Sequence, residues 1–228
     1  MAKPSVSELT FIHAGRTRYR DCWQVQREYF NRRVAGAIPD TVILTEHEHV
    51  YTLGRNAHAD HLLTGAEDLR VRGIDVVEVD RGGDITYHGP GQLVVYPIMD
   101  LENHGRDVGR YLRDLEQVVI RVLDRLGIRG ERLGGYTGVW VAGEKVCAIG
   151  IKASRWVSMH GLALNVSTDL SYFGGIIPCG IFERGVTSLQ EITGERYPMA
   201  TVEGLFVTEF CGIFDHAAPH VLESTEGR

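Results

Sequence analysis

The chain has 228 residues, of which 43% are hydrophobic and 24% charged, and its formal net charge is −6. These values are those of a globular protein with one substantial core, and they exclude a largely disordered chain. The acidic balance does not favour a nucleic-acid surface, and no apolar run is long enough to cross a bilayer. Four cysteines without a C-x-x-C pair favour a reducing compartment. We expect a cytoplasmic protein with neither nucleic-acid nor membrane partners.

The first half of the chain contains strand-like segments and one helical segment. Runs rich in β-branched and other apolar residues predict strands at residues 8–13, 41–46, 75–79 and 92–99. The last run, QLVVYPIM, is continuously apolar, as in a strand covered on both faces. After the first strand, apolar residues recur at helical spacing at Cys22, Val25 and Tyr29, which predicts a helix over residues 19–37.

The second half begins with the clearest helix, residues 106–127, whose apolar residues form one stripe and which ends at Gly127. Three strands joined by short turns are expected at residues 137–142, 144–154 and 159–166, as antiparallel neighbours. A last helix is expected over residues 199–214, with a frayed tail after residue 216. Strands clustered between helices indicate an α+β fold.

The segment RGGDITYHGPGQ, residues 81–92, is the first candidate for chemistry. Its four glycines permit positive φ angles and let backbone N–H groups approach a ligand, and Arg81 can pair with a carboxylate or a phosphate. An ordinary glycine-rich hairpin is the alternative. No long helix follows, so the segment is neither a Rossmann fingerprint nor a P-loop.

Two pairs of histidines raise the question of a metal site. His47 and His49 alternate on a predicted strand, and the spacing of His58 and His61 allows them to share a helix face. Neither pair comes with a carboxylate or a third ligand at a recognised spacing. We therefore predict no metal site and interpret these histidines as loop and surface residues.

Lys145 begins a mostly apolar strand, which is an unusual position for a charge. Alternation along the strand places Lys145 with Cys147 and Ile149 on one face and Lys152 on the other. If the sheet is covered on both sides, Lys145 is partly desolvated and can accept or donate a proton. A lysine that reaches water from the strand end is the alternative.

Cys179 lies in the apolar stretch GGIIPCGIFERGVTSL, between a proline and a glycine. The proline restrains the backbone, and the glycine leaves room for N–H groups to face the sulfur, as a reactive thiolate requires. A buried, inert cysteine is the alternative in so apolar a segment. Cys147 is the rival nucleophile because it shares the predicted face of Lys145, whereas Cys22 and Cys211 are interpreted as packing residues.

Five segments, in order along the chain, resemble the signatures of lipoyl(octanoyl) transferases, the octanoyl-carrier-protein:protein N-octanoyltransferases of lipoate biosynthesis. They are EHEHVYTLGR, RGGDITYHGPGQLVVYPI, KVCAIGIK, MHGLALNV and IIPCGI…GVTSL, within residues 46–189. The resemblance implies a fold similar to the catalytic domain of biotin and lipoate protein ligases, with a mixed, mostly antiparallel sheet and flanking helices. It makes residues 1–228 a single octanoyltransferase catalytic domain.

The resemblance also implies a two-step acyl transfer in protein lipoylation. Octanoyl, or lipoyl, passes from acyl carrier protein to Cys179 as a thioester, and then to the target lysine of a lipoyl domain, with Lys145 as the paired catalytic lysine. The residues implied to bind the substrate are Arg81, Gly82, Gly83, Asp84, Ile85, Thr86, Tyr87, His88, Ala148, Ile149, Gly150, His160, Gly161, Leu162 and Ala163.

No cofactor is implied, neither ATP nor a metal, because exchange between two thioesters is close to neutral in energy. The implied partners are octanoyl-acyl carrier protein, which carries phosphopantetheine, and the apo lipoyl domains of 2-oxoacid dehydrogenase complexes and glycine cleavage H protein. Docking of acidic partners requires a local basic patch. The candidates are Arg16, Arg18, Arg20, Arg32 and Arg33 in one set and Arg106, Arg110 and Arg113 in another.

An acyl chain also requires an apolar slot, since each buried methylene contributes about 0.8 kcal/mol. The candidates for its lining are Leu93, Val95, Ile149 and Leu162. His88 and His160 can orient the carbonyl or relay protons, or can be structural histidines that bond the backbone. The roles of Cys147 and Lys152 stay open at this point.

Three other functions compete with acyl transfer through a cysteine. An ATP-dependent ligase on the same fold activates a free acid as an adenylate and needs no nucleophilic cysteine. A non-catalytic acyl or lipoyl-domain binding protein would leave Lys145 and Cys179 idle. A cysteine hydrolase fits poorly, because no histidine and asparagine or aspartate partners stand at a recognisable spacing.

Overall fold

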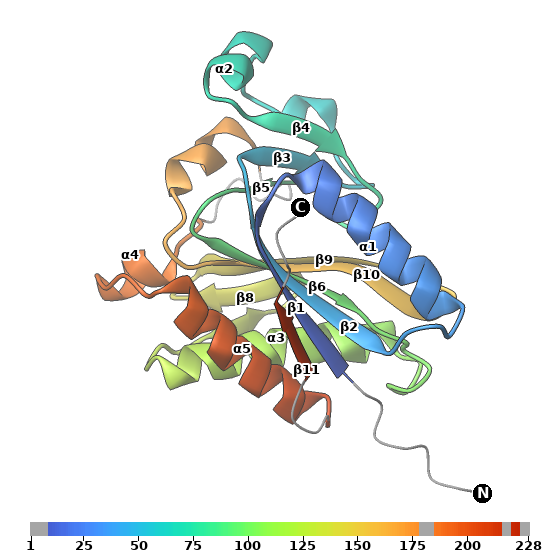
Figure 1. The fold of residues 1–228 in the computed structure, drawn as a ribbon. Helices are drawn as coiled ribbons and strands as arrows, with labels where there is room; N and C mark the ends of the chain where they lie inside the picture. Colours follow the sequence, from blue (N-terminus) through green and yellow to red (C-terminus); the bar gives the residue numbers. More distant parts are fainter. Residues whose placement is uncertain (1–8, 178–184, 216–219, 224–228) are drawn as a thin grey trace, which may run out of the picture.

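The computed structural model describes residues 9–177, 185–215 and 220–223. Its centre is an eight-stranded sheet in the order β11-β1-β2-β6-β10-β9-β8-β7 (Figure 1). Its strands are β1 (Leu9–Thr17), β2 (Asp40–His47), β6 (Gln92–Ile98), β7 (Glu131–Leu133), β8 (Tyr136–Val141), β9 (Glu144–Ser154), β10 (Val157–Asn165) and β11 (His220–Glu223). Strand β1 pairs in parallel with β2 and β11, and the other neighbours are antiparallel. The predicted α+β class with a mixed, mostly antiparallel sheet is confirmed.

Helices cover both faces of this sheet. The helices are α1 (Tyr19–Val34), α2 (Ala66–Val71), α3 (Val108–Arg125), α4 (Leu189–Thr193) and α5 (Met199–Ile213), and of these α1, α3 and α5 pack on the large sheet. Figure 1 shows α3 and α5 side by side on one face and α1 on the opposite face. Strand β6 contributes alternate residues to both layers, with Leu93 and Val95 facing α3 and α5 and Val94 and Tyr96 facing α1. Its continuous apolar run reflects this burial on both faces.

A smaller sheet of three strands lies beside α1. Strand β3 (Val50–Leu53) lies between β4 (Asp75–Glu78) and β5 (Ile85–His88), and two 3₁₀ turns accompany them, η1 (Ala59–His61) and η2 (Leu170–Gly175). The ring of Tyr87 stacks on Tyr172 of η2 with centroids 4.9 Å apart, and the Tyr51 hydroxyl donates to the Tyr172 carbonyl at 2.6 Å. These contacts fix the chain that leads to residue 177 against the small sheet.

The predicted elements agree with the observed ones for most of the chain, and the differences are local. The short strands β3, β5 and β7 were not predicted, because runs of three or four residues carry little periodicity. Helix α1 buries Cys22 as expected, but it also buries Gln26, and Val25 is 41% exposed, so the assignment of Val25 to the apolar face was wrong. Residues 220–223 form β11 where a frayed tail was expected. None of the helices described is long and apolar enough to span a membrane.

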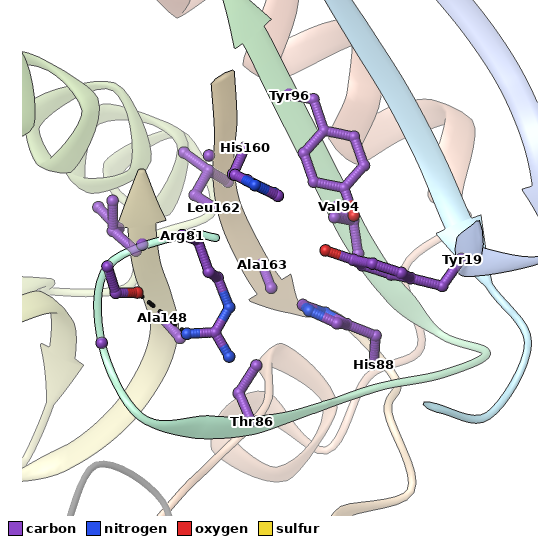
Figure 2. A pocket seen from close by; sticks show the side chains of 15 residues that line it. Tyr19, Arg81, Thr86, His88, Val94, Tyr96, Ala148, His160, Leu162 and Ala163 are labelled. Carbon is purple, nitrogen blue, oxygen red and sulfur yellow. Dashed lines mark hydrogen bonds between the residues drawn. The ribbon is translucent and has the colours of Figure 1, made fainter. Parts of the chain in front are cut away.

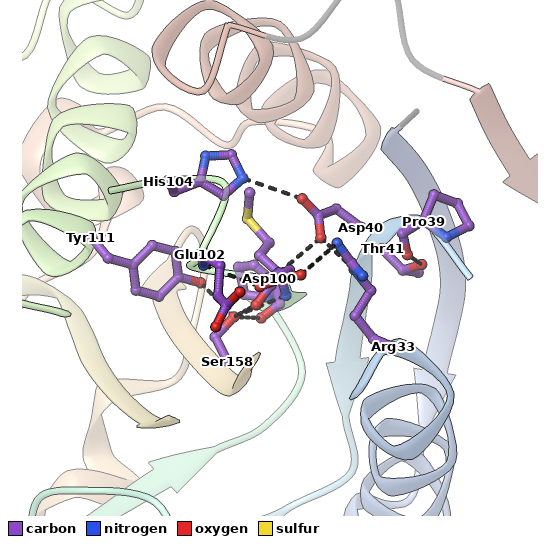
Figure 3. A network of polar contacts seen from close by, with 11 residues as sticks. Arg33, Pro39, Asp40, Thr41, Asp100, Glu102, His104, Tyr111 and Ser158 are labelled. Atoms are coloured by element: carbon purple, nitrogen blue, oxygen red, sulfur yellow. Dashed lines mark hydrogen bonds and ion pairs between the residues drawn. The ribbon is translucent and has the colours of Figure 1, made fainter. Parts of the chain in front are cut away.

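A buried carboxylate joins the start of β2 to the end of β6 (Figure 3). The Asp40 carboxylate is fully buried, and it accepts a hydrogen bond from Arg33 Nε at 2.8 Å and from the backbone N–H of Asp100 at 2.8 Å. The His104 ring lies 3.2 Å from its second oxygen. Burial alone would raise the pKa of Asp40, but the hydrogen bonds from His104, Arg33 and Asp100 hold it below its usual value.

Substitution Asp40→Asn is expected to lower the free energy of unfolding by about 2–3 kcal/mol at pH 7, because Arg33 then keeps a buried charge without its closest partner. A depressed carboxyl pKa stabilises the fold above about pH 4 and loses this effect as the pH falls through the folded pKa. Urea titrations at pH 7 and at pH 3.5 will therefore show a smaller difference between wild type and variant at the acidic pH.

The matched control is Glu67→Gln, which removes a pair that Glu67 makes with Arg70 on the exposed surface of α2. Exposed pairs contribute little to stability, so this variant will unfold at nearly the wild-type urea concentration. An equal loss of stability in the Asp40 and Glu67 variants would contradict the assignment of Asp40 as the stabilising carboxylate.

Candidate active site

A cavity lies between the large sheet and α1, and we call it the main cavity (Figure 2). The empty space in it, including the part that is open to solvent, is about 480 Å³. The residues that line it are Tyr19, Arg81, Gly82, Gly83, Thr86, His88, Val94, Tyr96, Ala148, Ile149, Gly150, His160, Gly161, Leu162 and Ala163.

Close backbone approach shapes this cavity, and glycine permits it. A Cβ atom on Gly161 would lie 2.1 Å from the Val95 carbonyl oxygen, and one on Gly150 would lie 2.8 Å from the Gly82 oxygen. The Gly82 N–H donates to the Ile151 carbonyl at 2.8 Å, so the loop after β4 rests directly on β9. No other residue type fits at these contacts without displacement of the backbone.

Arg81 supports this loop from within. Its guanidinium is buried and donates to the carbonyl oxygen of Thr52 at 2.8 Å and to the Thr52 hydroxyl at 3.0 Å. It also donates to the Gly82 carbonyl at 3.0 Å (Figure 2). The sequence suggested that Arg81 pairs with a carboxylate or a phosphate. In the fold it bonds backbone and hydroxyl oxygens, and thereby holds the small sheet and the glycine loop together.

Neutral aromatic and imidazole rings form one side of the main cavity. The His88 ring stacks on Tyr19 with centroids 5.8 Å apart and hydrogen-bonds Gln92 Oε1 through Nδ1 at 2.8 Å. Behind it, His47 Nε2 lies 2.7 Å from the Tyr96 hydroxyl. Burial lowers the pKa of His47 to about 4 and that of His88 well below its usual value. Both rings are therefore neutral near pH 7.

His160 is the first of the four consecutive β10 residues, 160–163, that line the main cavity. It is 1% exposed, and its φ angle is +60°, in the left-handed region that few residues other than glycine adopt. Its Nε2 lies 2.8 Å from Asp80 Oδ1, and the other Asp80 oxygen accepts from Lys152 Nζ at 2.5 Å. Hydrogen bonds from His160 and Lys152 outweigh the effect of burial and hold the pKa of Asp80 well below its usual value.

Lys145 lines a second cavity, which we call the lysine cavity. Its lining residues are Thr86, Gln92, Lys145, Ala148, Ala163, Asn165, Phe173 and Val186. Three of these residues, Thr86, Ala148 and Ala163, also line the main cavity, so the two cavities adjoin. Lys145 is 9% exposed, and its Nζ lies 4.8 Å from the centre of the Trp140 ring.

The predicted face of Lys145 was wrong. The register between β8 and β9 shifts where Trp140 pairs with Lys145 and Val139 pairs with Cys147, so β9 has one extra residue there. The extra residue reverses the alternation, so Lys145 lies in a cavity with Ala148, while Val146 and Cys147 pack in the layer under α3. Cys147 thus packs in the layer under α3 and does not line the lysine cavity. Burial raises the pKa of its thiol far above the usual value and outweighs the opposite effect of the Lys145 charge.

Cys179 lies outside the described residues, but the chain on both sides of its segment is described. The Ile177 N–H donates to the His61 carbonyl at 2.9 Å. On the other side, the Lys145 N–H donates to the Gly185 carbonyl at 3.0 Å, and the Thr187 N–H donates to the Lys145 carbonyl at 3.0 Å. The chain that follows residue 184 therefore pairs directly with Lys145.

The residues expected at a substrate site are divided between the main cavity and its surroundings. Twelve of the fifteen line the main cavity. The other three lie elsewhere, because alternation along β5 turns Ile85 and Tyr87 toward η2, and Asp84 pairs with His61 at 2.5 Å.

Three residues of the main cavity were not singled out from the sequence: Tyr19, Val94 and Tyr96. Leu93 and Val95 were expected to line an acyl slot, but they pack under α3 and α5. A strand buried on both faces carries no sequence signal for which face meets a cavity.

The other cysteines and histidines that the sequence singled out line neither cavity, and His47 is fully buried, so its interpretation as a loop or surface residue was wrong. Burial raises the pKa of Cys22 to about 12, and this thiol packs under α1. His49 stacks on Tyr172 with centroids 4.4 Å apart, and His58 lies against His61 at 5.1 Å. Over the residues that the structure describes, no three His, Cys, Asp or Glu side chains converge as metal ligands would.

A family model and two named relatives point to the same protein family. Residues 18–211 match the family described as the lipoyl protein ligase A/B catalytic domain. The chain is 51% identical over 210 residues to a protein named Octanoyltransferase from Chloroflexus aggregans, covering 91% of this chain and 95% of that one. It is 54% identical over 198 residues to the Octanoyltransferase of Rubrobacter xylanophilus, covering 86% and 89%.

Solved structures share the fold at low sequence identity. A putative lipoate protein ligase of Thermoplasma acidophilum with bound lipoic acid superimposes with a TM-score of 0.73 at 13% identity, covering 97% of this chain and 91% of that one. Lipoate-protein ligase A bound with ATP gives 0.73 at 13% identity, covering 96% and 90%. A biotin protein ligase of Aquifex aeolicus gives 0.55 at 14% identity, covering 91% and 70%.

Proposed function

Because this chain belongs to the lipoyl protein ligase A/B catalytic-domain family, we propose that it is an octanoyltransferase of protein lipoylation. It takes octanoyl, or lipoyl, from the phosphopantetheine thioester of acyl carrier protein and delivers it to the target lysine of an apo lipoyl domain. The relatives named Octanoyltransferase, at about half identity over most of the chain, support this activity. We propose residues 1–228 as one catalytic domain that works in the cytoplasm.

The proposed reaction has two steps joined by a thioester on Cys179. In the first, the Cys179 thiolate attacks the octanoyl carbonyl carbon, and the phosphopantetheine sulfur leaves and takes up a proton. In the second, the neutral amine of the acceptor lysine attacks the new thioester, Cys179 leaves as a thiolate, and the amine loses a proton. The sum moves one acyl group and consumes no ATP.

The burial and position of Lys145 are the observations that support this proposal most. Lys145 is nearly buried, its backbone pairs with Gly185 and Thr187, and it lines a cavity that adjoins a larger one. As an ammonium it stabilises the Cys179 thiolate, and as a proton acceptor it serves the second step. The main cavity then holds the acyl chain, and backbone N–H groups of the glycine loops are the proposed oxyanion donors.

The partner proteins are proposed as octanoyl-acyl carrier protein and the lipoyl domains of 2-oxoacid dehydrogenases and glycine cleavage H protein. The arginines considered as docking residues are partly neutralised within the fold. Arg33 is bound by Asp40, and Arg106 is paired with Glu102 at 2.6 Å. Arg110 pairs with Asp114 at 3.6 Å. These pairs weaken both basic patches as carrier docking sites.

Intact-protein mass spectrometry tests the proposed function. We expect the wild-type protein to gain one octanoyl group from octanoyl-acyl carrier protein in the absence of ATP and of any acceptor. Addition of an apo lipoyl domain will then return the protein to its original mass and acylate the domain. Acylation that occurs only with free octanoate and ATP would replace this function with that of a ligase.

A further inference from the structure

We propose that His160, held by Asp80 and Lys152 and backed by Trp23, forms an end wall that limits the length of the acyl chain. This proposal rests on the proposed function, since it assigns the main cavity to an acyl chain. His160 lines the main cavity (Figure 2) but is not one of the three residues that this cavity shares with the lysine cavity, so the wall lies away from that junction. Removal of the wall would connect the main cavity to a surface groove behind it.

The wall exists because the backbone at His160 departs from strand geometry. Alternation along β10 places Met159 and Ala163 on the α1 face, and Ser158 and Leu162 on the α3 face. By the same alternation, the side chain of His160 is expected on the α3 face. His160 departs from strand geometry because its φ angle is +60°. Its imidazole lies on the α1 face instead. Its centroid lies 6.3 Å from that of the Trp23 ring on α1. A strained conformation of this kind persists only where surrounding contacts hold it.

Two charged side chains behind His160 supply those contacts. Asp80 bonds His160 Nε2 with one oxygen and Lys152 with the other. The backbone N–H of His160 also donates to the buried Gln26 side chain at 3.3 Å. Because the Asp80 carboxylate accepts at Nε2, the neutral ring carries its proton there, and Nδ1 is left as an acceptor. Nδ1 is buried without a hydrogen-bond partner among the described residues.

The other side of the wall is open to solvent. A groove runs between α1, the end of β9 and the start of β10, and its empty space, including the part open to solvent, is about 1050 Å³. It is lined by Trp23, Asp80, Lys152 and Met159 among others, whereas His160 lines only the main cavity. Asp80 and its two partners thus separate the main cavity from a groove that is open to solvent.

The distance along β10 fits a chain of about eight carbons. Ala163 lies at the junction with the lysine cavity, and His160 lies three residues away, which is about 10 Å along a strand. An extended chain advances about 3.5 Å per three bonds, so the seven carbon–carbon bonds of an octanoyl group cover about 8 Å. A chain of twelve carbons must displace the imidazole or fold back.

The test compares the affinities of octanoate and dodecanoate for the intact protein by isothermal titration calorimetry. Wild type is expected to bind octanoate at least ~10-fold more tightly than dodecanoate. His160→Gly removes the ring and suits the positive φ angle, so we expect this preference to fall by at least ~10-fold. His160→Asn keeps a polar side chain that tolerates the same φ angle, and it should retain most of the preference.

Two further variants complete the test. Ile98→Ala loses buried volume in the same layer but lines neither the main cavity nor the groove, so its octanoate preference should equal that of wild type. Asp80→Asn weakens the hold on His160 without removing the ring, so it should shift the preference toward dodecanoate by less than His160→Gly does. If His160→Gly does not fold, Asp80→Asn decides the outcome.

If a folded His160→Gly protein, or the Asp80→Asn protein, keeps the wild-type preference for octanoate over dodecanoate, the end-wall proposal is wrong. Equal wild-type affinity for the two acids would also contradict it. Transfer from octanoyl-acyl carrier protein and dodecanoyl-acyl carrier protein is measured separately on the same variants. Absent transfer with a shifted binding preference would refute the transferase while leaving the wall in place, so the two failures are distinguishable.

Discussion

Substitution Cys179→Ala is expected to abolish the gain of one octanoyl group from octanoyl-acyl carrier protein and to lower transfer to a lipoyl domain by at least ~10³-fold. The alanine has no nucleophile to form the thioester, so neither half-reaction can begin. Intact-protein mass spectrometry without ATP measures the first effect, and the mass of the acceptor domain measures the second.

Cys147→Ala is the matched control for this thiol. Cys147 packs in the layer under α3, and burial raises the pKa of its thiol far above the usual value, so it cannot supply a thiolate. We expect this variant to be acylated like wild type. Acylation that survives Cys179→Ala but disappears in Cys147→Ala would move the nucleophile to β9 and contradict the proposal.

Substitution Lys145→Met is expected to slow both half-reactions by about 10²–10⁴-fold, the usual contribution of a positioned acid or base. Methionine keeps an apolar stem in the lysine cavity beside Trp140 but removes the ammonium. The thiolate then loses its adjacent positive charge, and the acceptor amine loses its proton acceptor. Single-turnover acylation, followed by discharge to a lipoyl domain, measures the two steps separately.

Lys145→Arg separates the two proposed roles. Arginine retains the positive charge but is not deprotonated in proteins, so it can stabilise a thiolate without accepting a proton. We expect the first step to be slowed less than in Lys145→Met and the second step to be slowed as much. Equal rates for wild type and both variants would show that Lys145 only packs against Trp140 and would leave the second step without its base.

Much of the fold could be predicted because its elements depend on local pattern. The helix that ends before Gly127 and the antiparallel strands β8, β9 and β10 follow from apolar periodicity and short turns, and the structure confirms them. The helix over residues 19–37 was also predicted, but its buried face was not, because Gln26 is buried to bond the backbone of His160. That requirement comes from a strand more than a hundred residues away.

The site could be predicted in part for the same reason. The glycine loop at residues 81–83 was identified from its local motif, and the glycines of β9 and β10 were implied by the family resemblance; the fold brings them together around one cavity. Tyr19 and Tyr96 were not identified, because an aromatic residue on a buried helix or strand has the same pattern whether it lines a cavity or fills a core.

The sequence by itself determined which segments form strands and helices and where glycines allow close backbone approach, because periodicity and steric freedom are local properties. Only the tertiary structure decided which way two side chains of the site project. An extra residue in β9 turns Lys145 into the lysine cavity, and a left-handed φ angle accompanies the position of His160 in the main cavity. The first depends on the register of the β8–β9 hairpin, in which strict alternation gives no sign of an extra residue. The second is held by contacts with Asp80 and Gln26, which lie 80 and 134 residues away in the sequence.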